Sequence, residues 1–506
     1  MRTIDDQPLI CLREPALAES RGSRSRTVPH LMRRQQGTIA IMSFAILTVM
    51  LGFCGLALDL SRTYNRKVEM QKVAEAVALA AARELNGTTD GVAAALVAAA
   101  NITANFHYQY EKIPVTWSDQ AIRFSRSPAR NGNWVDPDTA KASAGQLFYV
   151  RVDTNQLDAA HRSLDMIFMP ALSESLRTVS ISGSAVAGRT TIDAMPLAIC
   201  AMSLIPAAQR SNSGGFNELV EYGFRRGVSY DLMQLNPGPG AAANFLINPL
   251  APPATPGSAA DLTADVAGPY VCAGNMSMPR LGGDPVRVTQ PFPLASLFVQ
   301  LNSRFDNESF TGGQCNFRAA PPDRNIRAYT VASVSWMTTA TTQAAGPAAT
   351  VGKMETVADI APPGGPASQY GLLWAYAKAV PFTAYTPGIA EPSTGYTPFA
   401  TTNAVWASLY NLQKPNGYTA SPPYKASFGS NFASPSAAHG PGVNDRRVLR
   451  VPLLSCPVAA GANVPATVLA IGKFFMTIPA TATTINAEFA GAVRVQSVRG
   501  QVELFP

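Results

Sequence analysis

Residues 37–58 have the sequence GTIAIMSFAILTVMLGFCGLAL, the longest uncharged apolar stretch of the chain. As a helix, these 22 residues would be about 33 Å long, close to the thickness of a bilayer core. Ten of them are Ile, Leu, Phe or Val, which together favour membrane insertion by roughly 3–6 kcal/mol. Core helices of soluble proteins rarely run this long without a charge. We therefore predict a transmembrane helix bounded by Gly37 and Leu58.

Two cleavage sites compete with a retained membrane anchor. Gly55-Leu56-Ala57 resembles the small-x-small site of a signal peptide, and a cut there would release the rest of the chain. However, the apolar run is longer than a usual signal-peptide core, and the helical pattern continues past the site. A lipoprotein cut before Cys54 would need a small residue where Phe53 stands. We expect a retained anchor and keep release near Ala57 as the alternative.

The charges that flank the apolar stretch indicate its orientation. Five arginines lie in the twenty residues before Gly37, and four lysines or arginines lie in the twenty after Leu58. Cytoplasmic flanks carry the excess of positive charge. Because Arg33 and Arg34 directly precede the stretch and Asp59 follows it, we place the N-terminus in the cytoplasm.

Composition indicates a globular, turn-rich chain. Of 506 residues, 14% are charged, 47% are apolar and 78 are Gly or Pro, which argues against a long helical bundle. The net charge is +7, but residues 1–36, the expected cytoplasmic tail, hold seven Lys/Arg against four Asp/Glu and leave only +4 for the other 470. No basic face for nucleic acid is implied.

Four of the six cysteines follow the apolar stretch and one lies within it. The chain has no CxxC motif and only four histidines, so a zinc site is not expected, and oxidised pairs outside the cytoplasm are the natural interpretation. We favour Cys272 with Cys315, which closes a local loop. We also favour Cys200 with Cys456, because each lies beside an apolar stretch. Four buried free thiols remain the alternative.

The helical pattern continues past the apolar stretch. Over residues 59–85 the apolar side chains recur on one stripe, and Asn86-Gly87 is a typical helix stop. The stripe consists of Met70, Val73, Val77 and Ala81, and another face carries Arg62, Arg66 and Glu69. A second Ala-rich helix is expected over residues 91–108, packed back on the first.

Residues 33–87 combine an Arg-rich start, a Gly-initiated span, the exit sequence LGFCGLALDLSR and an Ala-rich helix containing MQKVAEAVALAAA. This block resembles the N-terminal module of the TadG-like branch of the TadE/TadG proteins of Tad (Flp) pilus assembly. The resemblance implies a single-pass protein of the bacterial inner membrane with a periplasmic C-terminal domain. It also implies that the partners are pilus-assembly proteins and pseudopilins of the Tad system.

The same resemblance raises the question of prepilin processing. Type IV pilin-like proteins are cut after a glycine and commonly carry a glutamate at the fifth mature position. Gly37 meets the first condition, but the fifth residue after it is Met42, so we expect Gly37 to remain uncut. Met32 could be the native first residue, and residues 1–31 would then be an over-extended gene start. For this reason Cys11 is given no weight in the cysteine pairing.

The predicted fold class is α+β, with a single N-terminal transmembrane helix that continues into an exposed helix. Residues 59–192 are expected to form this helical stalk and a pilin-like α+β unit, and residues 193–506 a β-rich extracytoplasmic domain. In the first part we expect a short helix near 157–168 and strands at 115–117, 122–124, 147–152 and 179–187. In the second we expect strands at 328–336, 448–454, 466–476 and 492–498, and loops or linkers at 236–260, 345–367 and 380–440.

Motifs for catalysis or ligand binding are weak. The segment 59–63, DLSRT, matches the DxSx[ST] metal-binding start of a von Willebrand factor A domain, but the run before it has the length of a membrane span. Residues 346–354, GPAATVGKM, miss a P-loop by one residue of spacing and by Met354 in place of Ser or Thr. No GxSxG elbow occurs. We expect Asp306 and Glu308 to be solvated.

Aromatic residues gather in the 380–440 stretch. They could form an adhesive or subunit-contact surface, but we favour the interpretation that they pin a long loop onto the core. They are Tyr385, Tyr396, Phe399, Trp406, Tyr410, Tyr418 and Tyr424.

These observations predict a non-enzymatic component of Tad/Flp-type pilus assembly that acts by protein contacts in the periplasm. No catalytic, cofactor-binding or metal-binding residue is expected, and neither is a small-molecule substrate. A secreted or surface adhesin released near Ala57 is the alternative. A periplasmic hydrolase with an unrecognised site is a third hypothesis.

Overall fold

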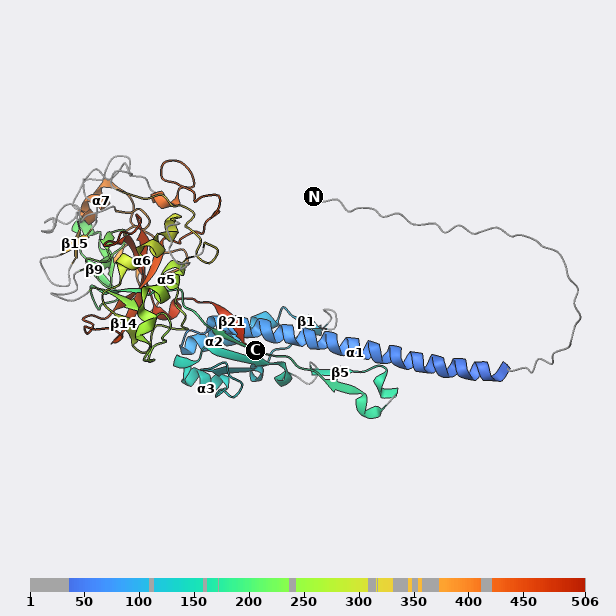
Figure 1. The fold of residues 1–506 in the computed structure, drawn as a ribbon. Helices are drawn as coiled ribbons and strands as arrows, with labels where there is room; N and C mark the ends of the chain where they lie inside the picture. Colours follow the sequence, from blue (N-terminus) through green and yellow to red (C-terminus); the bar gives the residue numbers. More distant parts are fainter. Residues whose placement is uncertain are drawn as a thin grey trace, which may run out of the picture. The chain divides into compact units, whose positions relative to one another are not determined.

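The computed structural model describes the chain from residue 36 onward with several gaps (Figure 1). The described residues are 36–108, 113–157, 162–171, 173–235, 243–307, 315, 317–330, 345–347, 354–356, 373–410 and 421–505. They fall into two compact units. The first contains the described residues of Met1–Ser61 and Met166–Arg177, and the second those of Arg62–Asp165 and Thr178–Pro506.

The long blue helix of Figure 1 is α1, Gln36–Glu84, an unbroken helix of 49 residues. In its second half the predicted stripe is confirmed, since Met70, Val73, Val77 and Ala81 are at most 2% exposed. Gly87, with φ +80°, follows the helix end as predicted. On the other face Arg66 is buried, and its guanidinium lies 3.5 Å from the Glu69 carboxylate. A long arginine side chain can be covered by segments that a helical wheel does not include.

The second half of α1 shares one core with α2, Thr89–Thr103, and with a four-stranded antiparallel sheet. Relative to the predicted helix over 91–108, α2 begins two residues earlier and ends five residues earlier. It begins earlier because the Thr88 hydroxyl caps it by accepting the Gly91 N–H at 3.1 Å, and it ends before β1. The sheet order is β21-β7-β4-β3, with bounds Val502–Phe505, Ser184–Arg189, Tyr149–Asp153 and Ile122–Ser125.

The remaining elements of this part are short, and several differ from the prediction. They are α3 (Pro137–Ala142) and the hairpins β1–β2 (His107–Tyr108, Ile113–Pro114) and β5–β6 (Ser163–Asp165, Thr178–Ser180). The strand expected at 115–117 lies at β2 instead, and β5 replaces the end of the helix expected over 157–168. The single strand expected at 179–187 is two strands, β6 and β7. Between them lies Gly183, where a Cβ would be 2.6 Å from the Gln71 backbone.

The main element of the C-terminal part is an eight-stranded sheet in the order β12-β20-β19-β17-β8-β13-β14-β18. All neighbours are antiparallel except β17 and β8. Its two faces pack against separate apolar cores, so that in β19 Phe474 faces one core and Ile471 the other. In the order of the sheet, the strands are Ser229–Asp231, Asn486–Val493, Val468–Met476, Val448–Leu454, Leu197–Cys200, Asn244–Ile247, Val286–Thr289 and Val464–Ala466.

The strand predictions for this part are partly confirmed. The strand at 448–454 is β17, and the one at 466–476 is β19. The strand at 492–498 was wrong, because β20 ends at Val493 and residues 495–497 form a 3-10 turn. Residues 328–330 are not in a strand, and the rest of 328–336 lies outside the described residues.

Shorter elements surround the sheet. They are α5 (Ala264–Ala273), α6 (Leu294–Asn302), α7 (Asn403–Tyr410), the three-stranded sheet β11-β10-β9 (Phe224–Arg225, Glu218–Glu221, Ala208–Arg210) and the hairpin β15–β16 (Ala345–Pro347, Met354–Thr356). The expected loops therefore contain regular structure: β13 lies in 236–260, the β15–β16 hairpin in 345–367 and α7 in 380–440. Apolar side chains such as Phe245 supply the burial that composition alone did not indicate.

Two disulfides connect the C-terminal part. Cys200, at the end of β8, is bonded to Cys456, just after β17, with a Cα–Cα distance of 5.6 Å. Cys272, in α5, is bonded to Cys315, with a Cα–Cα distance of 5.8 Å. These are the pairs favoured from the sequence. With one long apolar N-terminal helix and a β-rich remainder, the fold class is α+β, as predicted.

Candidate functional site

The first half of α1 is an extended uncovered apolar surface. Between residues 39 and 58 its large apolar side chains are 40–71% exposed. Full exposure to water costs roughly 1.5–3 kcal/mol for each such side chain relative to burial, and patches of this extent mark interaction sites. No other described helix is long and apolar enough to cross a membrane.

At the end of this apolar half, the Asp59 side chain is buried although its neighbours are exposed. One carboxylate oxygen accepts the Ile167 N–H at 3.0 Å, and the other accepts the N–H groups of Phe168 and Met169, both at 2.8 Å. Hydrogen bonds to a charged acceptor are the strong ones. Asp59 therefore fastens the segment between β5 and β6, Met166–Arg177, to α1 within the first unit.

Gly55 lies one helical turn before Asp59 and contacts the same segment. A Cβ at Gly55 would lie 2.6 Å from the Phe168 ring, closer than atoms can approach. Gly52, one turn earlier, has nothing within 4 Å of the corresponding position. The absence of a side chain at Gly55 is what lets Phe168 pack against the helix backbone. We call the contact of Gly55 and Asp59 with residues 167–169 the helix-exit clamp.

Comparison with protein families bears on this helix. Residues 37–84 match the family model Tad, described as putative Flp pilus-assembly TadE/G-like. The N-terminal helix is therefore similar to the TadE/G-like family. The match confirms the resemblance suggested by the sequence and supports a role in pilus assembly, and it spans nearly all of α1. No curated protein and no solved structure matches the chain.

The helix-exit clamp argues against the metal-site interpretation of residues 59–63. Both oxygens of Asp59 accept backbone N–H groups, and an N–H donor points at the position that a cation would occupy. The described residues also contain no group of three or more His, Cys, Asp or Glu side chains that could hold a metal ion.

The P-loop-like segment has the wrong local fold for phosphate binding. A P-loop connects a strand to a helix, whose N-terminal N–H groups hold the phosphates. Here Gly346 lies in β15 and pairs with Glu355 of β16, so the segment connects two antiparallel strands. Residues 348–353 lie outside the described residues.

Ser436, His439 and Asp306 form a cluster that resembles a hydrolase triad in composition only. Asp306 Oδ1 and Ser436 Oγ lie 2.6 Å and 2.9 Å from the same ring nitrogen, Nδ1 of His439. A catalytic relay needs the two groups on opposite ring nitrogens. The expectation that Asp306 is solvated was wrong, because it also accepts the Ser436 N–H at 2.6 Å. Glu308 lies outside the described residues.

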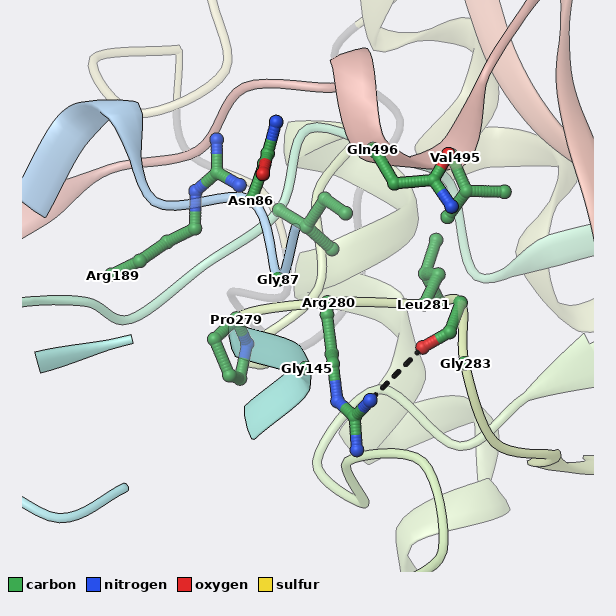
Figure 2. Close-up of a pocket in the computed structure, with 12 residues that line it drawn as sticks. Asn86, Gly87, Gly145, Arg189, Pro279, Arg280, Leu281, Gly283, Val495 and Gln496 are labelled. Atoms are coloured by element: carbon green, nitrogen blue, oxygen red, sulfur yellow. Dashed lines mark hydrogen bonds between the residues drawn. The ribbon is translucent and has the colours of Figure 1, made fainter. Parts of the chain in front are cut away.

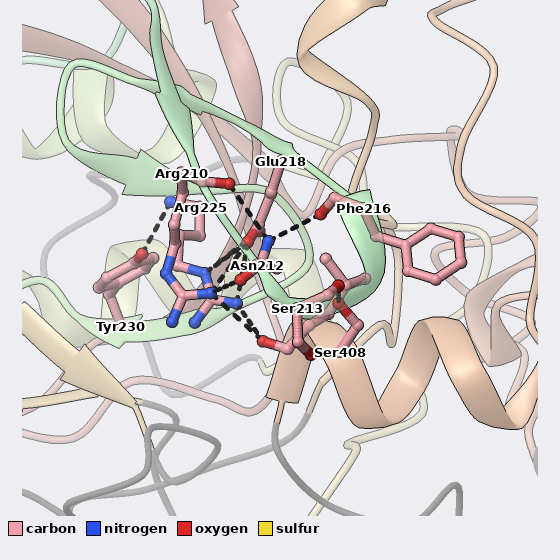
Figure 3. A network of polar contacts seen from close by, with 9 residues as sticks. Arg210, Asn212, Ser213, Phe216, Glu218, Arg225, Tyr230 and Ser408 are labelled. Atoms are coloured by element: carbon pink, nitrogen blue, oxygen red, sulfur yellow. Dashed lines mark hydrogen bonds and ion pairs between the residues drawn. The ribbon is translucent and has the colours of Figure 1, made fainter.

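Two buried carboxylates in the C-terminal part accept hydrogen bonds from neighbouring segments of the chain. Figure 3 shows Glu218, which is fully buried, accepting from Nε of Arg225 with both oxygens, at 3.1 Å and 3.0 Å. Arg225 also donates to the Leu409 carbonyl at 2.8 Å and so ties β10 and β11 to α7. A second carboxylate at a similar depth, Glu488 on β20, accepts the Tyr376 and Ala377 N–H groups at 2.8 Å and 2.6 Å.

The protonation of Glu488 is sensitive to its burial. Desolvation raises the pKa of this carboxyl to about 7, more than the backbone N–H bonds lower it. Glu488 holds residues 375–377 against the sheet, and its role in the described structure is to stabilise the fold.

The aromatic residues of 380–440 mainly pack inward where they are described. Trp406 and Tyr424 are buried, and Phe399 packs against the larger core. Tyr385 and Tyr396 are half-buried, with Arg226 lying 5.1 Å from the Tyr396 ring centre. This agrees with the interpretation that they pin the chain to the core. The side chains of Tyr410 and Tyr418 lie outside the described part.

A small pocket lies where the end of α1 meets the C-terminal part (Figure 2). Gly87, Arg189 and the 279–283 segment line it. Arg189 donates to the Val498 carbonyl at 3.0 Å, and Arg280 pairs with Asp284 at 2.7 Å. The pocket brings together no nucleophile and base.

The sequence did not predict the helix-exit clamp. A signal was present in the sequence, because MIFMP at 166–170 is an apolar run and Gly55 is spaced one turn from Asp59. We had assigned the start of that run to the end of a helix. The boundaries Gly37 and Leu58 remain predictions; both residues lie in α1, and Leu58 is 54% exposed.

Proposed function

We propose that this protein is a non-enzymatic, membrane-anchored component of Tad/Flp-type pilus assembly. Its anchor is the apolar half of α1, residues 37–58, with the N-terminus in the cytoplasm and the remaining chain in the periplasm. The observation that carries the proposal is that the uncovered apolar helix and the segment matched by the TadE/G-like family coincide. The partners are pilus-assembly proteins and pseudopilins of the Tad system.

Two further observations support export and a binding role. Both disulfides lie after the apolar half of α1, and stable disulfides form in oxidising compartments. Among the described residues, the Ser/His/Asp cluster and the pocket lack catalytic geometry. Contacts with other proteins are the activity that this architecture best supports.

The anchor is tested by Leu47→Arg, with Leu204→Arg as the matched control. The two leucines are 57% and 60% exposed, but only Leu47 lies in the apolar half of α1. One arginine at the centre of a span costs about 2.5–3.5 kcal/mol. We expect the Leu47 variant to leave the carbonate-washed membrane fraction or to fail to be exported, whereas the control stays. Equal retention of both variants would contradict the anchor.

The partners are tested by crosslinking in cells, followed by mass spectrometry. Adducts with Tad pilus proteins, lost when the Tad genes are deleted, are expected. A soluble, fully functional protein that forms no such adduct and begins at Leu58 would favour the alternative, a secreted adhesin.

A further inference from the structure

The segment Met166–Arg177, which joins β5 and β6, exposes large apolar side chains. Ile167 is 62% exposed, Phe168 43% and Leu176 37%. The exposed Arg177–Glu174 ion pair lies at the other end of the segment. A short segment that exposes large apolar side chains and also carries an exposed ion pair is typical of a surface that meets a membrane interface.

The helix-exit clamp fixes the level of this segment along α1. Phe168 contacts Gly55, and Asp59 accepts the N–H groups of residues 167–169. Gly55 belongs to the last turn of the proposed span, about 6 Å before Asp59 along the helix axis. Whatever surrounds the helix at Gly55 therefore also surrounds Ile167 and Phe168.

We propose that the segment Met166–Arg177 is a second membrane contact, which rests in the interface of the leaflet where α1 leaves the bilayer. The occupant of the apolar surface is lipid, because the surface is continuous with the apolar half of α1. Because the clamp holds this segment beside α1, the helix would have a second contact with the membrane at its side. This contact would restrict the tilt of α1 and fix how deeply it is inserted. This inference rests on the proposed membrane anchor.

Tryptophan placed at Ile167 tests the contact. Full-length Ile167→Trp is reconstituted in phosphatidylethanolamine–phosphatidylglycerol vesicles, with and without lipids brominated near the glycerol end of the acyl chain. Ile389→Trp is the matched control, because Ile389 is 65% exposed on a loop of the second unit. The fluorescence of the five native tryptophans is subtracted with the wild-type protein.

We expect the tryptophan at 167 to emit at shorter wavelength and to lose most of its fluorescence in brominated vesicles, while the control emits as in water and keeps its fluorescence. Phe168→Trp provides a second site should the first variant fold poorly. If neither tryptophan is quenched in protein that resists carbonate washing, this inference fails and the anchor stands. If the protein washes off the vesicles, both fail. The lipid assignment would be overturned if the tryptophan at 167 emitted as in water in vesicles and if a crosslinker at residue 167 formed adducts with other proteins in cells. The segment would then be a protein-docking surface.

Discussion

Replacement of Asp59 by asparagine should weaken the attachment of residues 167–169 to α1. The carboxylate accepts the Ile167 N–H through one oxygen and the Phe168 and Met169 N–H groups through the other, at 2.8–3.0 Å. Asparagine has one acceptor oxygen, so if it keeps the pair at Phe168 and Met169, its NH₂ group faces the Ile167 N–H. At least one strong hydrogen bond is lost, and a donor meets a donor.

The size of this effect follows from the bonds removed. A hydrogen bond to a charged group contributes roughly 1.5–3 kcal/mol, and the two that remain are weakened by the loss of charge. We expect local opening to become easier by about 3 kcal/mol, which is about a 100-fold faster amide exchange. Alanine at Asp59 removes all three bonds and should have a larger effect.

Hydrogen–deuterium exchange of the purified protein in detergent, followed on peptides that cover residues 163–171, measures this change. Asp138→Asn is the control, because it removes the same charge from a side chain that is 94% exposed. Peptides from β17 should be unchanged in both variants. The same exchange rate at 167–169 in the Asp59 variant, the control and the wild type would refute the clamp.

Three further predictions follow from the structure. Gly55→Leu should displace Phe168 and speed exchange at 167–169, whereas Gly52→Leu, with nothing within 4 Å, should not; equal effects would show that the contact is absent. Burial raises the pKa of Glu488 to about 7 from 4.5, so folding favours the protonated carboxyl. The contribution of this group to the stability of the folded state is therefore complete below pH 4.5 and is lost as the pH rises through 7. The loss amounts to about 3 kcal/mol, so the denaturation midpoint of the wild type should fall over this range relative to Glu488→Gln, and parallel pH profiles would contradict it. Replacing Cys272 and Cys315 by serine opens a loop of 43 residues and should cost about 4 kcal/mol of stability; non-reducing peptide mapping of the wild type should recover the linked peptides, and free thiols there would rule out the pair.

Those parts of the fold that depend on local pattern could be predicted. The stripe at Met70, Val73, Val77 and Ala81 is buried because a helical period reports one buried face. The run at 448–454 is β17, and apart from the exposed Arg450 its residues are apolar, as suits a strand in a sheet covered on both faces. Local pattern fixed the end of α1 as well, through Gly87.

Contacts between distant parts of the chain could not be predicted in the same way. The last strand, β21, pairs with β7 and so joins the end of the chain to the N-terminal sheet, a pairing that no local periodicity encodes. Asp59 finds its donors 108 to 110 residues further along the chain. Asp306 finds His439 at a separation of 133 residues. A polar residue beside an apolar run looks solvated until its distant partner is known, which is why the role of the clamp emerged only from the structure.

The most direct test of the central claim is the mass of the protein extracted from membranes. Peptide mapping of the carbonate-resistant protein should recover residues 37–58 joined to Asp59 and the sequence after it, because α1 is proposed to remain uncut, with its first half in the bilayer. A mature protein that begins at Leu58 and is soluble without detergent would contradict the account.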